Sequence, residues 1–182
     1  LAAEKFCDWP ADVRAQAGAM AAGWAGPALP APQGPPMPAA GAPGSIETYR
    51  SSINSWEVDE HGNAHLRFLV MRFSNAMGHL WTRMGLTGAV RRELNLGVAA
   101  LDYDVRYHRP LKNGDSLVVV SGVLDLGEKT LRLGHHMLEA DHGSAVASIA
   151  IVLTMFDLER RKSVPMPASV REAAAQFLLP AG

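Results

Sequence analysis

The chain has 182 residues, of which 48% are hydrophobic and 19% are charged, and its formal net charge at pH 7 is −1. This length suffices for one domain with a sizeable core, and this composition excludes wholesale disorder. The balanced charge offers no basic surface for nucleic acid or an anionic membrane. No apolar run reaches the roughly 18 residues that a membrane-spanning helix needs. We therefore expect no nucleic acid and no membrane as partners.

A single cysteine, Cys7, excludes an intrachain disulfide and suits a reducing compartment. The first residues lack the charged and then apolar pattern of a secretory signal peptide. These features predict a soluble, cytoplasmic protein. The histidines His61 and His65 have no thiol near them and no third ligand in the sequence, so we expect no metal site and no cofactor.

The N-terminal part differs in composition from the rest of the chain. An alanine-rich stretch favours a helix over residues 11–22. Seven of the twelve prolines then alternate with alanine and glycine, which favours extended backbone and disfavours both helix and sheet. We predict a helical extension over residues 1–25, a linker or surface-hugging arm over 26–44, and one domain over 45–182.

From residue 46 onward, apolar residues recur in a regular pattern. Residues 46–57 favour a β-strand, and residues 59–65 form a polar turn. Residues 66–84 show helical spacing and predict one long helix, buried on most sides, with Gly85 as its C-terminal cap. The members of the apolar repeat are Leu66, Leu69, Val70, Phe73, Met77, Leu80, Trp81 and Met84.

Four further stretches rich in valine, leucine and isoleucine are separated by turn residues, which is typical of an antiparallel meander. A short helix is expected over residues 168–177. A helix about 28 Å long can be wrapped by one antiparallel sheet of five strands, an α+β arrangement. The four later strands are predicted over residues 95–108, 117–126, 130–140 and 145–158.

The polar turn before the long helix holds the strongest candidates for chemistry. Asp59 supplies a carboxylate close to the helix start, where unpaired backbone N–H groups favour negative charge or a polarised carbonyl. Asn63 and His65 follow within six residues. The alternative for Asp59 is a cap of the turn or helix, and for His65 an exposed position in the first helical turn. His61 and His65 have the spacing of a helical metal pair, but a glycine turn separates them.

Three stretches, residues 56–62, 105–115 and 156–167, follow one another at a spacing found in a known family. The first contains an Asp-x-x-Gly turn before a helix, the second a strand with a Gly-Asp turn, and the third a strand that runs into two prolines. On these residues the chain, from about 45 to 178, resembles the hotdog-fold acyl-CoA thioesterases, in particular the 4-hydroxybenzoyl-CoA-thioesterase-like branch.

The resemblance implies a hotdog fold, hydrolysis of an acyl-CoA or acyl-carrier-protein thioester, and a homodimer or homotetramer. It implies that Asp59 acts as general base or nucleophile and that the backbone N–H of Leu66 polarises the carbonyl. Gly62 matches the glycine of the family's turn. The family has His where this chain has Asn63, and Asn where it has His65. The polar pair is therefore exchanged, and both residues stay candidates for the catalytic site.

Two further groups of residues are candidates for substrate contact. Tyr107 and His108, near the end of their strand, would contact substrate at a dimer interface, and a place in the core or at its rim is the alternative. Arg160, Arg161 and Lys162 would suit the phosphates of coenzyme A, and a solvated run of charges is the alternative.

Two other functions stay open beside thioester hydrolysis. Enoyl-CoA hydratases and dehydratases of the same fold place an Asp and a His a few residues apart at the helix start, as Asp59 and His65 are. A non-catalytic acyl-binding module is the third possibility, favoured by the exchanged polar pair and the proline-rich arm. The three functions differ in product: a free thiol, a change in enoyl absorbance, or binding without turnover.

Overall fold

The computed structural model describes residues 10–22 and 37–180, and the chain divides into two compact units, Leu1–Gln33 and Gly34–Gly182. In the first unit, helix α1 (Ala11–Ala22) occupies the alanine-rich stretch in which a helix was predicted. The predictions for the rest of residues 1–25 and for residues 26–36 fall almost wholly outside the described residues.

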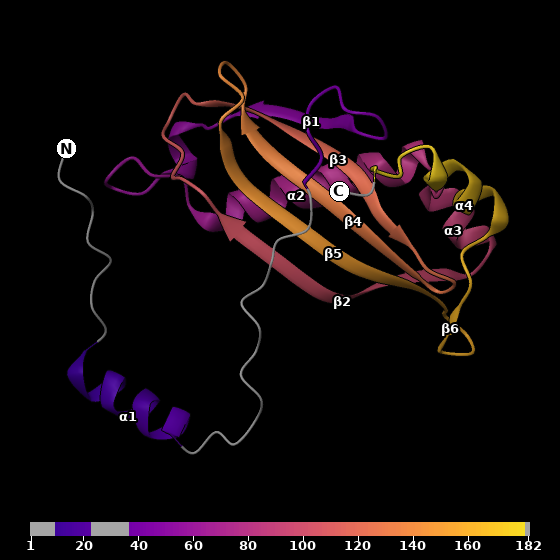
Figure 1. The fold of residues 1–182 in the computed structure, drawn as a ribbon, viewed down its shortest axis with the longest axis horizontal. Helices are drawn as coiled ribbons and strands as arrows, with labels where there is room; N and C mark the ends of the chain where they lie inside the picture. The colour runs from indigo at the N-terminus through magenta and orange to yellow at the C-terminus, as the bar shows by residue number, and fades with distance from the viewer. Residues whose placement is uncertain (1–9, 23–36, 181–182) are drawn as a thin grey trace. The chain divides into compact units, whose positions relative to one another are not determined.

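In the second unit an antiparallel sheet curls around helix α2 (Figure 1). Its strand order is β1-β3-β4-β5-β2, and the short strand β6 pairs with β5. The predicted α+β hotdog architecture, five main strands around one long helix, is confirmed, and β6 is an addition to it. The strands are β1 (Ile46–Ser52), β2 (Leu96–Tyr107), β3 (Ser116–Leu126), β4 (Thr130–Glu139), β5 (Ala145–Asp157) and β6 (Lys162–Val164).

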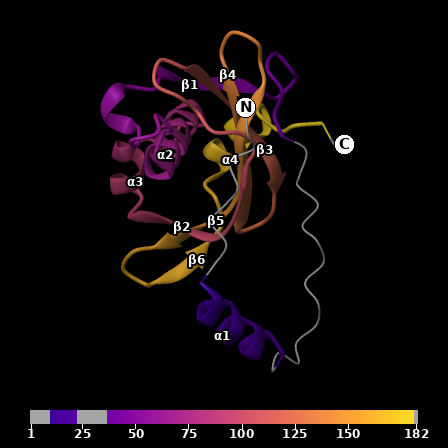
Figure 2. The same cartoon turned by 90° about the vertical axis from the view of Figure 1, so that its left-hand side faces the viewer.

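Helix α2 (Leu66–Arg83) lies on one face of the curled sheet (Figure 2). It ends as expected, because Gly85 has the left-handed φ of +78° and its N–H donates to the carbonyl of Thr82. The expectation that the helix is buried on most sides is wrong for the single chain. One sheet covers only one side of α2, so Leu66 and Val70 stay 54% and 46% exposed. The buried apolar side chains of α2 are Leu69, Phe73, Ala76, Leu80 and Trp81.

The first strand is shorter than predicted. β1 ends at Ser52, and Ser55–Glu57 form a 3₁₀ turn, η1. The N–H of Asn54 donates to the Glu57 carboxylate at 2.8 Å, which favours a turn over a continued strand. A short helix α3 (Gly88–Glu93) was not predicted, and the final helix α4 (Ala168–Ala175) agrees with prediction.

The two edges of the sheet differ in how their backbone groups are covered. Along β1, Nδ1 of His79 contacts the carbonyl oxygen of Thr48, and Nη2 of Arg72 donates to that of Ser52 at 2.9 Å. Helix α2 therefore caps this edge. At the other edge, no strand of the described segments pairs with the outer side of β2, which leaves β2 free to pair with another chain.

A buried polar chain crosses the sheet beneath α2. Oγ1 of Thr48 donates to the Val119 carbonyl and lies 2.6 Å from Oγ of Ser121, which lies 2.6 Å from Nδ1 of His135. This pattern is satisfied when Nδ1 of His135 carries the proton, which leaves Nε2 as a buried acceptor without a partner in the described part of the chain. Burial lowers the pKa of His135 to about 4. A second N–H on this ring would have no acceptor in the core.

His135 therefore makes stability depend on pH. Its folded-state pKa lies below the ordinary value of 6.5, so its contribution is complete above pH 6.5 and is lost as the pH falls towards 4. We expect this histidine to account for a fall of about 3 kcal/mol in the free energy of unfolding over that range. Urea unfolding at several pH values measures it. The variant His135→Leu should lack this part of the pH dependence, and an unchanged slope in that variant would contradict the assignment.

Candidate active site at the start of helix α2

The segment between η1 and α2 folds as a small hairpin. Val58 and Ala64 form an antiparallel bridge, and the N–H of Asp59 donates to the carbonyl of Asn63 at 2.8 Å. Gly62 has a φ of +77°, a conformation that glycine adopts without strain, and its N–H donates to the carbonyl of Asp59 at 2.9 Å. The Asp-x-x-Gly spacing therefore closes the turn.

The hairpin is fastened to the segment that follows β2. The N–H of Ala64 donates to the carbonyl of Leu111 at 2.8 Å, and Nζ of Lys112 donates to Oδ1 of Asn63 at 2.5 Å. Tyr107, the last residue of β2, is four residues from Leu111, so at most about 14 Å of chain separates them. The end of β2 and the hairpin thus lie at the same end of the sheet.

The Asp59 carboxylate has two oxygens in different situations. Oδ1 accepts hydrogen bonds from the backbone N–H groups of His61 and Asn63, both at 2.9 Å. The hydrogen bond from Asn63 is the largest influence on the pKa of Asp59 and, with that from His61, outweighs desolvation and holds this pKa below its ordinary value of 3.8. Oδ2 accepts no hydrogen bond from the described part of the chain. Asp59 is therefore the predicted turn cap and also an ionised carboxylate with a free oxygen.

The start of α2 supplies unpaired donors beside this hairpin. The N–H of His65 donates to the carbonyl of Glu57 at 2.8 Å, but the His65 side chain does not cap the helix. The backbone N–H of Leu66 has no acceptor among residues 10–22 and 37–180, as expected for a first helical residue. The His65 ring is exposed and lies 6.4 Å from that of Phe68. Asp59, the exchanged pair Asn63 and His65, and the N–H of Leu66 thus all lie on one segment of eight residues.

Of the two strand-end candidates, only Tyr107 lies on the face of β2 turned towards α2. Its side chain is 45% exposed, and desolvation raises its pKa to about 12. Nε2 of His108 lies 3.2 Å from Oγ of Ser148, and its ring lies 6.3 Å from that of His136, on the outer face of the sheet. The alternation of side chains along a strand separates the two neighbours. The structure does not bring His108 to the hairpin.

The basic run Arg160, Arg161 and Lys162 lies at the opposite end of the sheet. Arg160 and Arg161 lie in the turn between β5 and β6, and Lys162 begins β6, next to the start of β2; all three side chains are exposed. Strand β2 has 12 residues and spans about 36 Å between this turn and the hairpin. Within one chain, these three cations are remote from Asp59.

An apolar groove of about 310 Å³ follows the side of α2 that faces β2. Its apolar lining residues on α2, Val70, Phe73 and Met77, belong to the helical repeat of this helix. Its polar member on α2, Ser74, donates its hydroxyl to the carbonyl of Val70 at 3.2 Å. The residues that line the groove are Val70, Phe73, Ser74, Met77, Tyr103, Val105, Ile149 and Ile151.

Comparison with known protein families assigns the chain to a superfamily. The family model of the thioesterase-like superfamily matches residues 53–174, more than half of the chain. The chain belongs to the thioesterase-like superfamily. No curated protein sequence matches it significantly.

Solved structures share the superfamily's hotdog fold with this chain. A hypothetical protein from Staphylococcus aureus, solved in complex with CoA, is 18% identical with a TM-score of 0.69, over 75% of this chain and 88% of that one. A 1,4-dihydroxy-2-naphthoyl-CoA thioesterase from Synechocystis is 14% identical with a TM-score of 0.64, over 72% and 96%. The gentisyl-coenzyme A thioesterase BH1999 is 20% identical with a TM-score of 0.59, over 69% and 97%. Identities this low show the fold alone.

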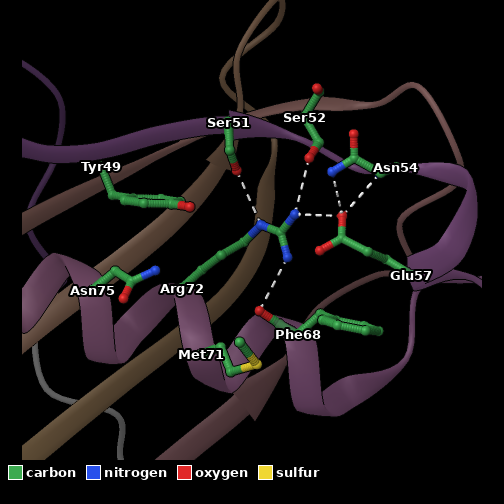
Figure 3. Close-up of a pocket in the computed structure, with 9 residues that line it drawn as sticks. All are labelled: Tyr49, Ser51, Ser52, Asn54, Glu57, Phe68, Met71, Arg72 and Asn75. Carbon is green, nitrogen blue, oxygen red and sulfur yellow. Dashed lines mark hydrogen bonds and ion pairs between the residues drawn. The ribbon is translucent and has the colours of Figure 1, made fainter.

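A polar cavity of about 330 Å³ lies on the other side of α2 in this thioesterase-like domain (Figure 3). It contains Glu57 and Arg72, which the sequence analysis missed although both are charged and more than nine-tenths buried. Two patterns could have revealed them. Glu57 follows Asn54 by three residues, as in a capping box, and Arg72 falls on the buried side of the helical repeat, where a charge needs a partner.

The described residues hold no group of three or more His, Cys, Asp or Glu side chains placed to bind a metal ion. No helix in the same residues has the length and apolar character needed to cross a membrane.

Proposed function

We propose that this member of the thioesterase-like superfamily hydrolyses an acyl-CoA or acyl-carrier-protein thioester to a free acid and a thiol. One observation carries the proposal: the ionised carboxylate of Asp59, with a free oxygen, lies on the hairpin that leads directly into the unpaired N–H of Leu66. The names of similar structures support it, since two are CoA thioesterases and a third was solved with CoA.

In this mechanism the N–H of Leu66 donates to the thioester carbonyl oxygen. One preorganised donor of this kind contributes about 3–4 kcal/mol to stabilising the oxyanion. Asp59, as general base, removes a proton from water while the water oxygen attacks the carbonyl carbon. The carbon–sulfur bond then breaks, the electron pair leaves with sulfur, and the thiolate takes up a proton. In the nucleophilic variant, Asp59 attacks first and water hydrolyses the resulting anhydride.

The remaining residues of the hairpin take supporting roles in the proposal. His65, exposed at the helix start, can hold the water or protonate the leaving thiolate. Asn63, whose side-chain oxygen is bound by Lys112, keeps its amide N–H groups for the water or the substrate carbonyl. Gly62 keeps the turn free of a side chain, and Tyr107 forms a wall from β2.

The apolar groove suits the acyl chain. Its lining on α2 runs from Val70 to Met77, which is about 10 Å along the helix. Each methylene buried there contributes about 0.8 kcal/mol, roughly a fourfold gain in kcat/KM when it is felt in the transition state. A preference for aliphatic chains long enough to fill the groove follows from this.

A second candidate function, an acyl-binding module without turnover, has one observation in its favour. Oδ1 of Asp59 already accepts two backbone N–H groups, and the Asn63 side chain is already held by Lys112. Both residues therefore have a structural role in the absence of substrate.

The test compares two aspartates that have the same structural role. Oδ1 of Asp157 accepts the N–H groups of Glu159 and Arg160 at 2.9 and 2.8 Å, as Oδ1 of Asp59 accepts two, but it lies at the far end of the sheet. Thiol release is followed with short, medium, long and aryl acyl-CoAs and an acyl-carrier protein. Asp59→Asn should lower kcat by about 10²–10⁴, the usual range for losing a general base. Asp157→Asn should leave kcat unchanged.

Other outcomes of this experiment separate the alternatives. Acyl-CoA binding without thiol release in the unmutated protein would favour the binding module. A change in enoyl absorbance without thiol release would favour the hydratase. Equal losses in the two aspartate variants would reduce Asp59 to a turn cap.

The proposal includes a homodimer formed through β2. The edge of β1 is capped by α2, so β2 is the edge left for pairing, and a two-fold pair of β2 strands would close the assembly. The face of β2 turned to α2 also exposes Tyr103, Val105 and Tyr107 by 44–55%, and a partner would cover part of this surface.

Light scattering at micromolar concentration checks the assembly. We expect a dimer or a tetramer built from such dimers. Val105→Glu should shift the population towards monomer, because it would bury an unpaired charge at the interface. Leu158→Glu replaces an equally exposed apolar residue in the β5–β6 turn and should leave the assembly intact. A monomeric unmutated protein would contradict the proposal.

A further inference from the structure

A buried ion pair joins the η1 turn, which follows β1, to helix α2 (Figure 3). Oε2 of Glu57 accepts a hydrogen bond from Nη2 of Arg72 at 2.7 Å, and the two residues are only 6% and 5% exposed. Arg72 also donates to the hydroxyl of Ser51 at 3.0 Å and to the carbonyls of Ser52 and Phe68 at 2.9 and 3.1 Å. Its guanidinium therefore binds β1, α2 and Glu57 at the same time.

Glu57 links the hairpin, the η1 turn and helix α2 through its hydrogen bonds. Its carbonyl accepts the N–H of His65 at 2.8 Å, which closes the base of the hairpin. Its carboxylate accepts the N–H and Nδ2 of Asn54 at 2.8 and 3.1 Å. Burial acts to raise the pKa of Glu57, but the hydrogen bonds from Arg72 and Asn54 outweigh it and hold the pKa below its ordinary value. The Glu57 carboxylate is therefore ionised at neutral pH.

We infer that Glu57 and Arg72 are positioning residues for thioester hydrolysis, whose ion pair fixes the Asp59 carboxylate relative to the N–H of Leu66. The inference rests on the proposed function. Asp59 lies two residues after Glu57, and Leu66 lies six residues, about 9 Å, before Arg72 along α2. The pair thus binds the chain on both sides of the two groups whose separation matters.

The pair acts without touching the reacting atoms. Its polar cavity opens on the side of α2 that faces β1, with Tyr49 and Asn75 among its other lining residues. Leu66 and the apolar groove belong to the side that faces β2. A substrate whose acyl chain fills the groove therefore reaches Asp59 and Leu66 from the side opposite to Arg72.

Two physical arguments favour positioning over simple stabilisation. A buried ion pair is weak evidence for stability, because apolar residues of similar volume often replace both partners without loss. Catalysis is more demanding, since a displacement of about 1 Å between reacting groups can cost a hundredfold in rate. Loss of the pair should therefore lower kcat more than it lowers the stability of the fold.

The test replaces both partners at once and measures kcat, KM and melting temperature. The double variant Glu57→Leu/Arg72→Met should fold and should lose about ten- to a hundredfold in kcat, with little change in KM. In the single variant Glu57→Gln, the amide oxygen can still accept hydrogen bonds from Asn54 and Arg72. This variant should therefore keep most of the kcat that the double variant loses. The control is Glu47→Leu/Arg50→Met, which removes an ion pair of 2.8 Å from the exposed side of β1 and should keep the original kcat.

Hydrogen exchange supplies a readout that needs no activity. The N–H groups of Asp59 and His65 should exchange faster in the double variant, while those of β4 should not. No thiol release from the unmutated protein would overturn the proposed function and leave this readout standing. Unchanged kcat and unchanged exchange in the double variant would overturn the inference. If that variant does not fold, Arg72→Lys decides: reduced kcat at an unchanged melting temperature supports the inference, and unchanged kcat overturns it.

Discussion

The proposed chemistry depends on the unpaired N–H groups at the start of α2. A helix leaves its first amides without intrahelical acceptors, and many helices satisfy one of them with a capping side chain. Here His65 occupies the capping position without making that bond. The N–H of Phe68 donates to the His65 carbonyl at 3.0 Å, whereas the N–H of Leu66 has no acceptor among the described residues. The hairpin before the helix then brings a carboxylate to the same end, where the helix dipole favours the ionised form. The donor and the carboxylate therefore both belong to residues 59–66, the hairpin and the first residue of α2.

The two sides of α2 make different contacts with the sheet. On the side of β1, Arg72 and His79 bind strand carbonyls, so polar contacts hold the helix to the sheet and cover an edge. On the side of β2, the helix and strand expose apolar side chains and leave a groove. The polar side fixes the helix, and the apolar side is the one that we propose accepts the acyl chain and a second subunit.

The sequence was sufficient for the long helix and the five main strands, though not for the end of β1, for α3 or for β6, because the main signals are local. The helical repeat of α2 and the runs of valine and isoleucine in β3 and β5 each follow from the periodicity of one element. The Asp-x-x-Gly turn was also predictable, since Gly62 needs the left-handed conformation that its turn requires.

The orientation of the strand ends and the buried ion pair were not predictable in the same way. A register shift in β2 between Ala100 and Asp102 resets which side chains face α2, and it decides that Tyr107 faces inwards and His108 outwards. The partners Glu57 and Arg72 are fifteen residues apart and meet only after η1 has folded back onto α2. Such pairings depend on tertiary contacts, which the spacing of residues within one helix or strand does not reveal.

The most direct test of the proposed site is a crystal structure with an acyl-CoA analogue in which a methylene replaces the thioester sulfur, so that the carbonyl is kept and cannot be hydrolysed. The account predicts the carbonyl oxygen about 3 Å from the backbone nitrogen of Leu66, with Oδ2 of Asp59 facing the carbonyl carbon or a water beside it. The acyl chain should follow α2 past Val70 towards Met77. A carbonyl bound elsewhere, above all in the polar cavity beside Arg72, would contradict the account.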